Sequence, residues 1–128
     1  KREHIIRAAQ ESIAYQVNDL LTAMKRDTGV VLSSLSVDGG ASRDSFLMQF
    51  QADISNCTIR RPVIRETTAL GACYLAGLAT GVWSSRDELK ELWRCDTLYA
   101  PSMEDEKRSR LLNGWDKAVG RSLDWAEH

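Results

Sequence analysis

Apolar residues recur at steps of three and four positions along the first part of the chain, which is the spacing of one face of an α-helix. These positions are Ile6, Ala9, Ile13, Val17, Leu20, Leu21 and Met24. Gly29 follows them, at a place where a glycine in the left-handed conformation commonly ends a helix. The pattern therefore predicts one long helix that ends just before Gly29.

A short strand, a glycine pair and a second helix are predicted next. Residues 34–37 alternate serine with leucine or valine, which is typical of a strand with one buried face, and the sequence Asp-Gly-Gly at 38–40 interrupts it. An amphipathic helix then has its apolar face at Phe46, Leu47, Phe50 and Ile54. We expect Ser42 to be its N-cap and Asp44 to lie in its first turn, where a carboxylate interacts favourably with the helix dipole.

The second half of the chain alternates extended and helical segments. Residues 58–63 predict a strand with Pro62 near its end or on a sheet edge, and a helix is predicted from Thr67 or Thr68 to Gly81. Two further helices are predicted where a serine precedes an acidic residue by three positions, the capping-box pattern. The pairs are Ser85 with Glu88 and Ser102 with Asp105. The segment at 95–101 is expected to be extended or irregular.

The order of these elements predicts an α/β domain that is rich in helices and has a short sheet of two to three strands. We treat residues 1–128 as a single domain. Two strands make a poor sheet by themselves, and the chain opens directly in a helical pattern without an initiator methionine. We therefore expect it to be a portion of a longer protein.

Composition narrows the class of protein. The 17 basic and 18 acidic residues give a net charge of −1, so the chain has no electrostatic signature of a nucleic-acid or membrane-surface partner. The three cysteines form no CxxC pair, which is typical of reduced thiols in a cytoplasmic protein. The longest weakly polar run, at 68–83, is too short and too rich in small residues to span a bilayer, and no export signal is present.

Familiar catalytic motifs are absent from the sequence. It contains no GxxxxGKS/T, GxGxxG, HExxH or GxSxG motif, and its histidines, His4 and His128, lie near the chain ends. The strand–Asp-Gly-Gly–helix segment is the best chemical candidate, because glycines let backbone amides approach an anion at a helix N-terminus. The same residues also make an ordinary tight turn, and spacing by itself favours the turn.

Four other features each have a structural and a functional interpretation. The small residues Gly71, Ala72, Ala76 and Gly77 would form a dimer face or, as we favour, let their helix pack closely on a sheet. Three arginines would either bind a phosphate or lie on a solvated strand edge; they are Arg60, Arg61 and Arg65. The acidic residues at 104–106 suit a helix dipole, which argues against a metal site. The tryptophans, Trp83, Trp93, Trp115 and Trp125, are expected to pack in the core or in a groove.

Four segments resemble the C-terminal part of the FGGY family of carbohydrate kinases, in the family's order and over almost the whole chain. They are HIIRAAQESIAYQVNDLLTAM, VDGGASRDSFLMQFQADI, ETTALGACYLAGLATGVW and GWDKAVGRSLDW. The run FLMQFQAD after VDGG is the most specific, and within the family it favours the members that phosphorylate glycerol.

The resemblance implies an actin-like ATPase (ribonuclease H-like) fold of two lobes, with MgATP and glycerol bound between them. This chain would be the end of the nucleotide-binding lobe. The family's catalytic aspartate, its glycerol site and its first phosphate-binding loop lie upstream, so the resemblance assigns no catalytic residue and no metal ligand here. We expect the chain to be inactive by itself, and the resemblance implies a homo-oligomer, a dimer or a tetramer.

Site residues are carried over by position. The backbone amide of Gly40 would face the nucleotide phosphate, and Ala41 would line the same pocket. At Asp44 the family commonly has an asparagine that faces the adenine; an ionised aspartate can accept a hydrogen bond but cannot donate one. Ser45 would be a possible donor beside it. Two alternatives stay open: another sugar kinase of the family, and a helical interaction module that does not bind nucleotide.

Overall fold

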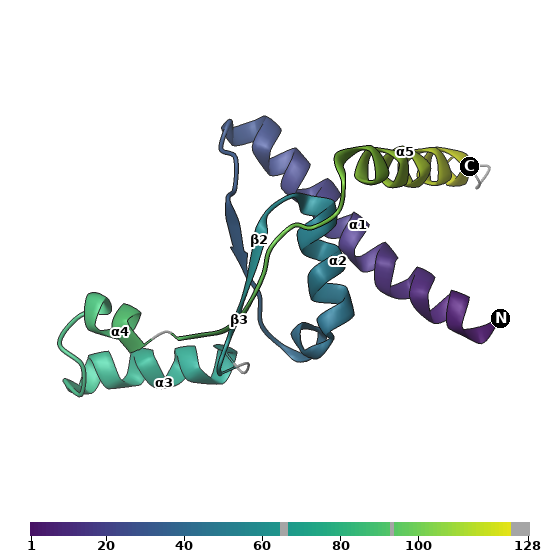
Figure 1. The fold of residues 1–128 in the computed structure, drawn as a ribbon. Coiled ribbons are helices and arrows are strands. Elements are labelled where there is room, and N and C mark those ends of the chain that lie inside the picture. The colour runs from purple at the N-terminus through teal and green to yellow at the C-terminus, as the bar shows by residue number, and fades with distance from the viewer. Residues whose placement is uncertain (65–66, 93, 124–128) are drawn as a thin grey trace, which may run out of the picture.

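The computed structural model of the chain describes residues 1–64, 67–92 and 94–123. In chain order its elements are α1 (Arg2–Thr28), β1 (Ser34–Ser36), the 3-10 helix η1 (Gly40–Arg43), α2 (Ser45–Ser55), β2 (Thr58–Pro62), α3 (Thr67–Thr80), α4 (Arg86–Leu92), β3 (Cys95–Tyr99) and α5 (Asp105–Ser122). The predicted order of helices and extended segments is confirmed, and the segment before the last helix is a third strand (Figure 1). Arg65, Trp93, Trp125 and His128 lie outside the described residues.

The strands form one sheet in the order β1-β2-β3. β1 and β2 are parallel, with Leu35 opposite Ile59, and β2 and β3 are antiparallel, with Ile59 opposite Tyr99. The crossover between the parallel strands runs through η1 and α2, so the glycine pair lies at the end of β1 where this crossover begins. Pro62 ends the central strand at a register shift opposite β3, which agrees with its lack of an amide donor.

The core lies between α2, the middle of α1 and the sheet. Its buried apolar residues are Ala14, Tyr15, Leu47, Met48, Phe50, Ala52, Ile54, Cys57, Ile59 and Tyr99. Helix α2 is buried along most of its length because it is covered by α1 on one side and by the sheet on the other. The apolar face predicted for α2 is therefore confirmed, and α2 fixes the direction in which the glycine loop leaves β1.

Helix α5 packs against this core with Leu111, Leu112 and Trp115. The Trp115 ring stacks on Tyr15 with the ring centroids 5.2 Å apart, and Tyr15 meets the edge of Phe50 at 5.6 Å. The Trp115 indole nitrogen also donates a 2.7 Å hydrogen bond to Asp19 of α1. Core packing was the expectation for this tryptophan, and the structure places it there.

Much of the apolar face of α1 is uncovered in this chain. Its buried residues are Ala14 and Tyr15, whereas Ile6 and Leu20 are 51% and 61% exposed. The helix is as predicted, but α2 crosses it near the middle and leaves both ends without cover (Figure 1). Beside the C-terminal half of α1, residues 30–32 are also exposed and border a groove of about 450 Å³.

Helices α3 and α4 form an arm that projects from the end of the sheet (Figure 1). The ring of Trp83 lies on the backbone of Gly77 and meets Tyr74 edge to face at 5.2 Å. The expectation that this small-residue helix packs on the sheet is wrong for the described residues, because β2 leads out of the sheet at Pro62 and α3 runs away from it. In this helix the small size of Gly77 makes room for the ring of Trp83.

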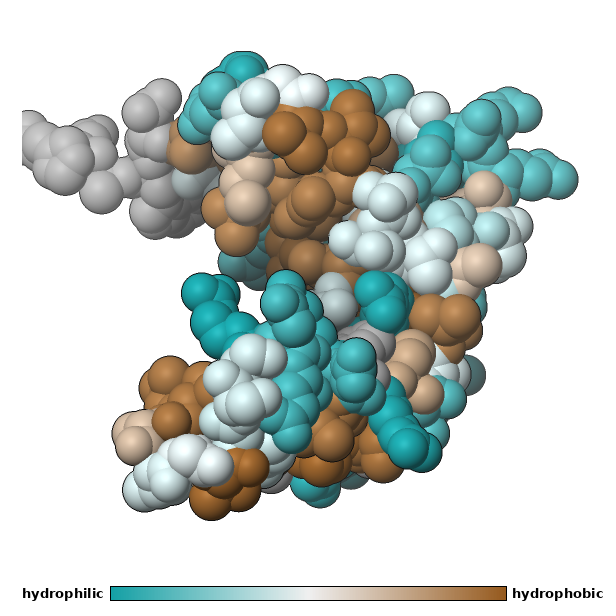
Figure 2. All heavy atoms as spheres, turned by 90° about the vertical axis from the view of Figure 1, so that its left-hand side faces the viewer, coloured by the Kyte–Doolittle hydropathy of each residue, from teal (hydrophilic) through white to brown (hydrophobic). Residues whose placement is uncertain are grey.

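Apolar side chains are prominent on the face seen in Figure 2, in an upper and a lower area separated by hydrophilic residues. Large exposed apolar residues of the α1–β1 connection and of the arm include Val30, Val31, Leu75 and Val82. A monomeric protein rarely exposes so much apolar surface without a partner. Among the described helices, none is long and apolar enough to cross a membrane.

Two of the predicted helix starts need correction. Asp44, not Ser42, is the N-cap of α2, because residues 40–43 form the separate turn η1 and the Asp44 carboxylate accepts a hydrogen bond from the Leu47 amide. The N-cap of α5 is Glu104, without a side-chain cap, because the Ser102 hydroxyl is bonded to Asp53 instead.

The predicted capping box of α4 is present in altered form. The Ser85 hydroxyl accepts from the Glu88 amide at 3.3 Å, as expected, but the Glu88 carboxylate reaches the amide and the hydroxyl of Ser84 at 2.8 and 2.9 Å. These hydrogen bonds from Ser84 lower the pKa of Glu88 below its ordinary value.

Candidate functional site

The two glycines after β1 have different conformations and different reasons to be glycine. Gly39 has φ 75° and ψ −174°, a backbone region that is open essentially to glycine alone. Gly40 begins η1 without a positive φ, and a Cβ added to it would meet no other atom within 4 Å. Gly39 therefore makes the turn, while Gly40 leaves a bare peptide in open space.

The start of η1 presents backbone amides. The amides of Ser42 and Asp44 donate to the carbonyls of Gly39 and Ala41 at 3.3 and 3.2 Å. The amides of Gly40 and Ala41 stand at the open end of the helix, where an amide has no acceptor inside its own helix. Both residues are exposed. Such a pair of amides is suited to an anionic oxygen.

Ala41 also lines a hollow of about 300 Å³ next to this turn. Ile13 and Val17 of α1, Leu47 and Met48 of α2, and residues 35–38 form most of its wall. The hollow is mainly apolar, and its polar lining residues are Ser36, Asp38, Ser42 and Gln51. An open amide edge thus adjoins an apolar recess, an arrangement that suits a ligand with an anionic end and an apolar end.

The Asp44 carboxylate already has protein partners. One oxygen accepts from the Leu47 amide at 3.1 Å, and the other accepts from the side-chain amide of Gln10 on α1. The predicted ligand contact of Asp44 stays a prediction, and this side chain also has a structural role that the sequence analysis did not assign. It caps α2 and joins α2 to α1.

The loop before the glycines contacts the start of α3. The Thr67 hydroxyl donates to the carboxylate of Asp38, which directly precedes Gly39. The N-terminal end of the α3–α4 arm is therefore tied to the turn. Asp38 and Asp44 place two carboxylates on either side of the exposed amides, and Arg43 between them is exposed as well.

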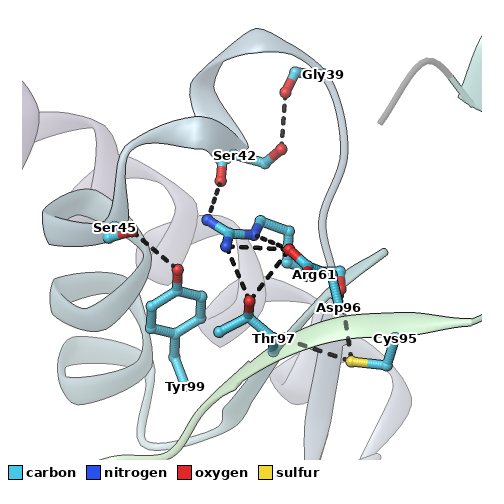
Figure 3. A network of polar contacts seen from close by, with 8 residues as sticks. All are labelled: Gly39, Ser42, Ser45, Arg61, Cys95, Asp96, Thr97 and Tyr99. Atoms are coloured by element: carbon cyan, nitrogen blue, oxygen red, sulfur yellow. Dashed lines mark hydrogen bonds and ion pairs between the residues drawn. The ribbon is translucent and has the colours of Figure 1, made fainter. Parts of the chain in front are cut away.

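A network of polar contacts lies behind the turn (Figure 3). Arg61 of β2 donates to Asp96 at 3.1 and 3.3 Å and to the Thr97 hydroxyl at 2.8 Å, both on β3. Its third branch is directed at the carbonyl of Ser42 at 3.4 Å. Close by, the Tyr99 hydroxyl donates to the Ser45 hydroxyl at 3.1 Å.

Both interpretations of Arg61 made from the sequence are therefore incomplete. The residue lies on the central strand rather than on a solvated edge, and its side chain is 11% exposed and paired with Asp96. The roles of Asp96 and Tyr99 were not predicted from the sequence. Helices α3 and α4 separate β2 from β3 along the chain, so the pairing of these two strands becomes visible only in the structure.

Comparison with known proteins identifies the family of the segment that contains this turn. Residues 1–80, which include the turn, match the profile of the FGGY family of carbohydrate kinases, C-terminal domain. The glycerol kinases of Caldanaerobacter subterraneus subsp. tengcongensis and Clostridium botulinum (strain Alaska E43) are 59% and 61% identical over 127 and 126 residues. These matches cover 99% and 98% of this chain and 26% and 25% of the relatives, so the chain spans about a quarter of their length.

Solved structures give the same result for the fold. A glycerol kinase of Plasmodium falciparum, determined with ADP, superposes with a TM-score of 0.85 at 39% identity, over 98% of this chain and 25% of that one. A xylulose kinase of Lactobacillus acidophilus superposes with a TM-score of 0.77 at 20% identity, which shows the fold alone. The fold is that of the helix-rich C-terminal part of an actin-like ATPase lobe. The chain belongs to the FGGY family of carbohydrate kinases, whose C-terminal domain its residues 1–80 match.

Proposed function

We propose that this chain forms part of the ATP-binding lobe of a kinase that transfers the γ-phosphate of ATP to glycerol, giving glycerol 3-phosphate and ADP. The observation that carries the proposal is the open turn at Gly40, inside the matched family domain and preceded by a glycine that makes the bend. The identities of 59% and 61% to two glycerol kinases support glycerol as the acceptor.

In the proposed site the amides of Gly40 and Ala41 donate to phosphate oxygens of the nucleotide. Phosphoryl transfer depends on positioning and on stabilisation of the charge that spreads over the phosphate oxygens, so fixed backbone donors contribute to it directly. The apolar hollow at Ala41 is where the base or the ribose would approach. Asp44 would contact the nucleotide through a remaining lone pair, since protein donors already occupy both of its oxygens.

The remaining parts of the reaction are assigned to residues outside this chain. No group of three His, Cys, Asp or Glu side chains among the described residues is placed to hold a metal ion. We therefore propose that Mg²⁺, which neutralises charge on the phosphates, is held by the nucleotide and by residues elsewhere in the protein. The glycerol site and the catalytic base are proposed to lie elsewhere too, and the chain by itself is expected to be inactive.

We further propose a cytoplasmic homo-oligomer, a dimer or a tetramer. The cytoplasmic location is supported by the near-neutral net charge and by three free thiols, those of Cys57, Cys73 and Cys95. The uncovered apolar surfaces of α1 and of the α3–α4 arm support burial against other parts of the protein or other subunits.

Nucleotide titration of the full-length protein tests the proposal. In Gly40→Val, side-chain atoms would occupy the open space next to the bare peptide, and we expect the Kd for ADP, measured by calorimetry, to rise at least about tenfold. Gly114→Val on α5 is the matched control, because its Cβ also points into open space. Unchanged ADP binding by Gly40→Val would refute this site.

The same titration separates the alternatives. A protein that binds no nucleotide at any concentration would be the helical interaction module. The negative charge of Asp44 and its hydrogen bonds from Gln10 and Leu47 favour this alternative. A protein that binds ATP but phosphorylates a sugar in preference to glycerol would be another kinase of the family. A panel of glycerol, xylulose and gluconate distinguishes these substrates.

A further inference from the structure

Strands β2 and β3 contact the turn and the start of α2 at two points (Figure 3). Arg61 is directed at the carbonyl of Ser42 at 3.4 Å, and the Tyr99 hydroxyl donates to Ser45 at 3.1 Å. The two side chains are also neighbours, since the Arg61 guanidinium lies 5.5 Å from the centre of the Tyr99 ring. The sheet thus contacts the segment that follows the exposed amides at two residues, Ser42 and Ser45.

The Arg61 side chain has little freedom to move. Its Nε and Nη2 atoms share one carboxylate oxygen of Asp96, and Nη2 also donates to Thr97. A planar guanidinium can satisfy these acceptors and still direct Nη1 at Ser42, whereas a lysine ammonium has no such fork. The position of Nη1 is therefore set by β3.

Ser42 transmits this position to the glycines. It is 1% exposed, and its hydroxyl donates to the carbonyl of Gly39 at 2.7 Å while its amide donates to the same carbonyl at 3.3 Å. The peptides of Gly40 and Ala41 lie between these two anchored residues. A displacement of Ser42 would consequently turn the amides of Gly40 and Ala41.

We infer that Arg61 and Tyr99 are positioning residues for nucleotide binding, which they support through Ser42 and Ser45 without touching the ligand. The inference rests on the proposed function of the turn. Fixed donors bind a developing or existing negative charge better than mobile ones, because no reorganisation is needed when the ligand arrives. A displacement of about 1 Å is enough to weaken such a site strongly.

A purely structural role for the pair makes a different prediction. In that case their loss would lower the stability of the domain and reduce the amount of folded protein, with equal effects on every ligand. A positioning role weakens nucleotide binding selectively. The Kd for ADP and the KM for glycerol, measured on the same folded preparation, separate the two roles.

The test uses the full-length protein with Tyr99→Phe, Arg61→Lys and Arg61→Ala. Tyr99→Phe keeps the ring and removes only the hydroxyl that reaches Ser45. We expect the Kd for ADP to rise about threefold in Tyr99→Phe and about tenfold in Arg61→Ala, with Arg61→Lys between wild type and Arg61→Ala. The KM for glycerol should stay within about twofold of wild type in each variant.

Two matched controls lie away from the turn. Arg108→Ala removes an arginine of similar exposure, 17%, that pairs with Asp105 at 2.7 Å on α5. Tyr74→Phe removes a hydroxyl from the α3–α4 arm. We expect both controls to bind ADP as the wild type does.

The outcomes are distinct. If the wild type binds ADP and Tyr99→Phe and Arg61→Lys bind it equally well, the positioning role is overturned and the proposed function stands. If the wild type binds no ADP, the proposed function itself fails. Should Arg61→Ala not fold, the two conservative variants decide the question.

Discussion

The backbone amide of Ser102 donates a 2.7 Å hydrogen bond to the carboxylate of Asp53, which is buried on α2. The same oxygen of Asp53 also accepts from the Met103 amide at 3.2 Å and from the Gln49 side chain at 3.0 Å. One carboxylate therefore joins α2 to the segment between β3 and α5. The N-terminal end of α5 is placed by this contact rather than by a cap of its own.

Asp53→Ala is expected to release that segment. The Ser102 and Met103 amides would lose their charged acceptor, at a cost of about 2–3 kcal/mol, since hydrogen bonds to charged groups are worth more than neutral ones. Hydrogen exchange of these two amides in the full-length protein should accelerate by about thirtyfold or more. Asp116→Ala, an exposed position on α5, is the control, and equal protection in both variants would contradict the expected role.

Gly39→Ala and Gly40→Ala should differ in stability. Gly39 has a conformation that costs an L-residue about 1–3 kcal/mol, whereas Gly40 has neither a positive φ nor a neighbour within 4 Å of an added Cβ. The unfolding temperature should fall for Gly39→Ala and stay near wild type for Gly40→Ala. The reverse order would show that the turn is made by the other glycine.

Asp44→Asn tests the helix-capping role of this side chain separately from its negative charge. Asparagine caps a helix about as well as aspartate, and the Gln10 side chain can turn its amide oxygen toward the new NH2 group, so α2 should keep its stability. Asp44→Ala should cost about 1 kcal/mol. Removal of a negative charge beside the proposed phosphate site should leave ADP binding unchanged or tighten it. Thermal unfolding and calorimetry measure the two effects, and weaker ADP binding by Asp44→Asn would indicate that the charge itself contacts the ligand.

Gly77→Ala should displace Trp83. A Cβ at Gly77 would lie 2.1 Å from an atom of the indole ring, so the ring must leave its contact with α3. The gain in helix propensity, about 1 kcal/mol, does not remove this overlap. We expect the tryptophan emission of the full-length protein to shift to longer wavelength. Gly71→Ala, which meets no atom within 4 Å, should leave the emission unchanged; a shift in both variants would point to a different cause.

Cys57 should be the slowest of the cysteines to react. Burial in the core raises the pKa of its thiol above the ordinary value, so less of the reactive thiolate is present at pH 8 and the rate should rise with pH toward that higher pKa. Cys73 and Cys95 are exposed and serve as internal controls. Alkylation followed by mass spectrometry measures each rate, and unfolding in urea should abolish the difference. Equal rates in the folded protein would mean that Cys57 is accessible.

Much of the fold was readable from local patterns. The long first helix ends at Gly29 as predicted, with φ 71°, and the central strand lies within the predicted extended segment. Helix starts were less accurate. Ser42 and Ser102 have the residue type of an N-cap, but the Ser42 hydroxyl donates to the Gly39 carbonyl within the separate turn η1, and the Ser102 hydroxyl donates to Asp53 of α2. Local capping rules do not include such partners.

The candidate site was located by resemblance more than by spacing. The glycine pair was found from the sequence. The different roles of Gly39 and Gly40 were not, because the φ angle of a residue cannot be read from the sequence. The contributions of Arg61 and Tyr99 depend on the pairing of β2 with β3 across the intervening α3–α4 arm. No periodicity within either strand encodes that register.

The sequence by itself determined the family, the order of helices and strands, and the position of the glycine turn, since each of these follows from local composition or from matched segments. The tertiary structure decided which glycine carries the strained conformation, which serine is buried, and which arginine supports the turn. These features arise from contacts between residues far apart in the chain, and such contacts exist only once α2 has packed between α1 and the sheet.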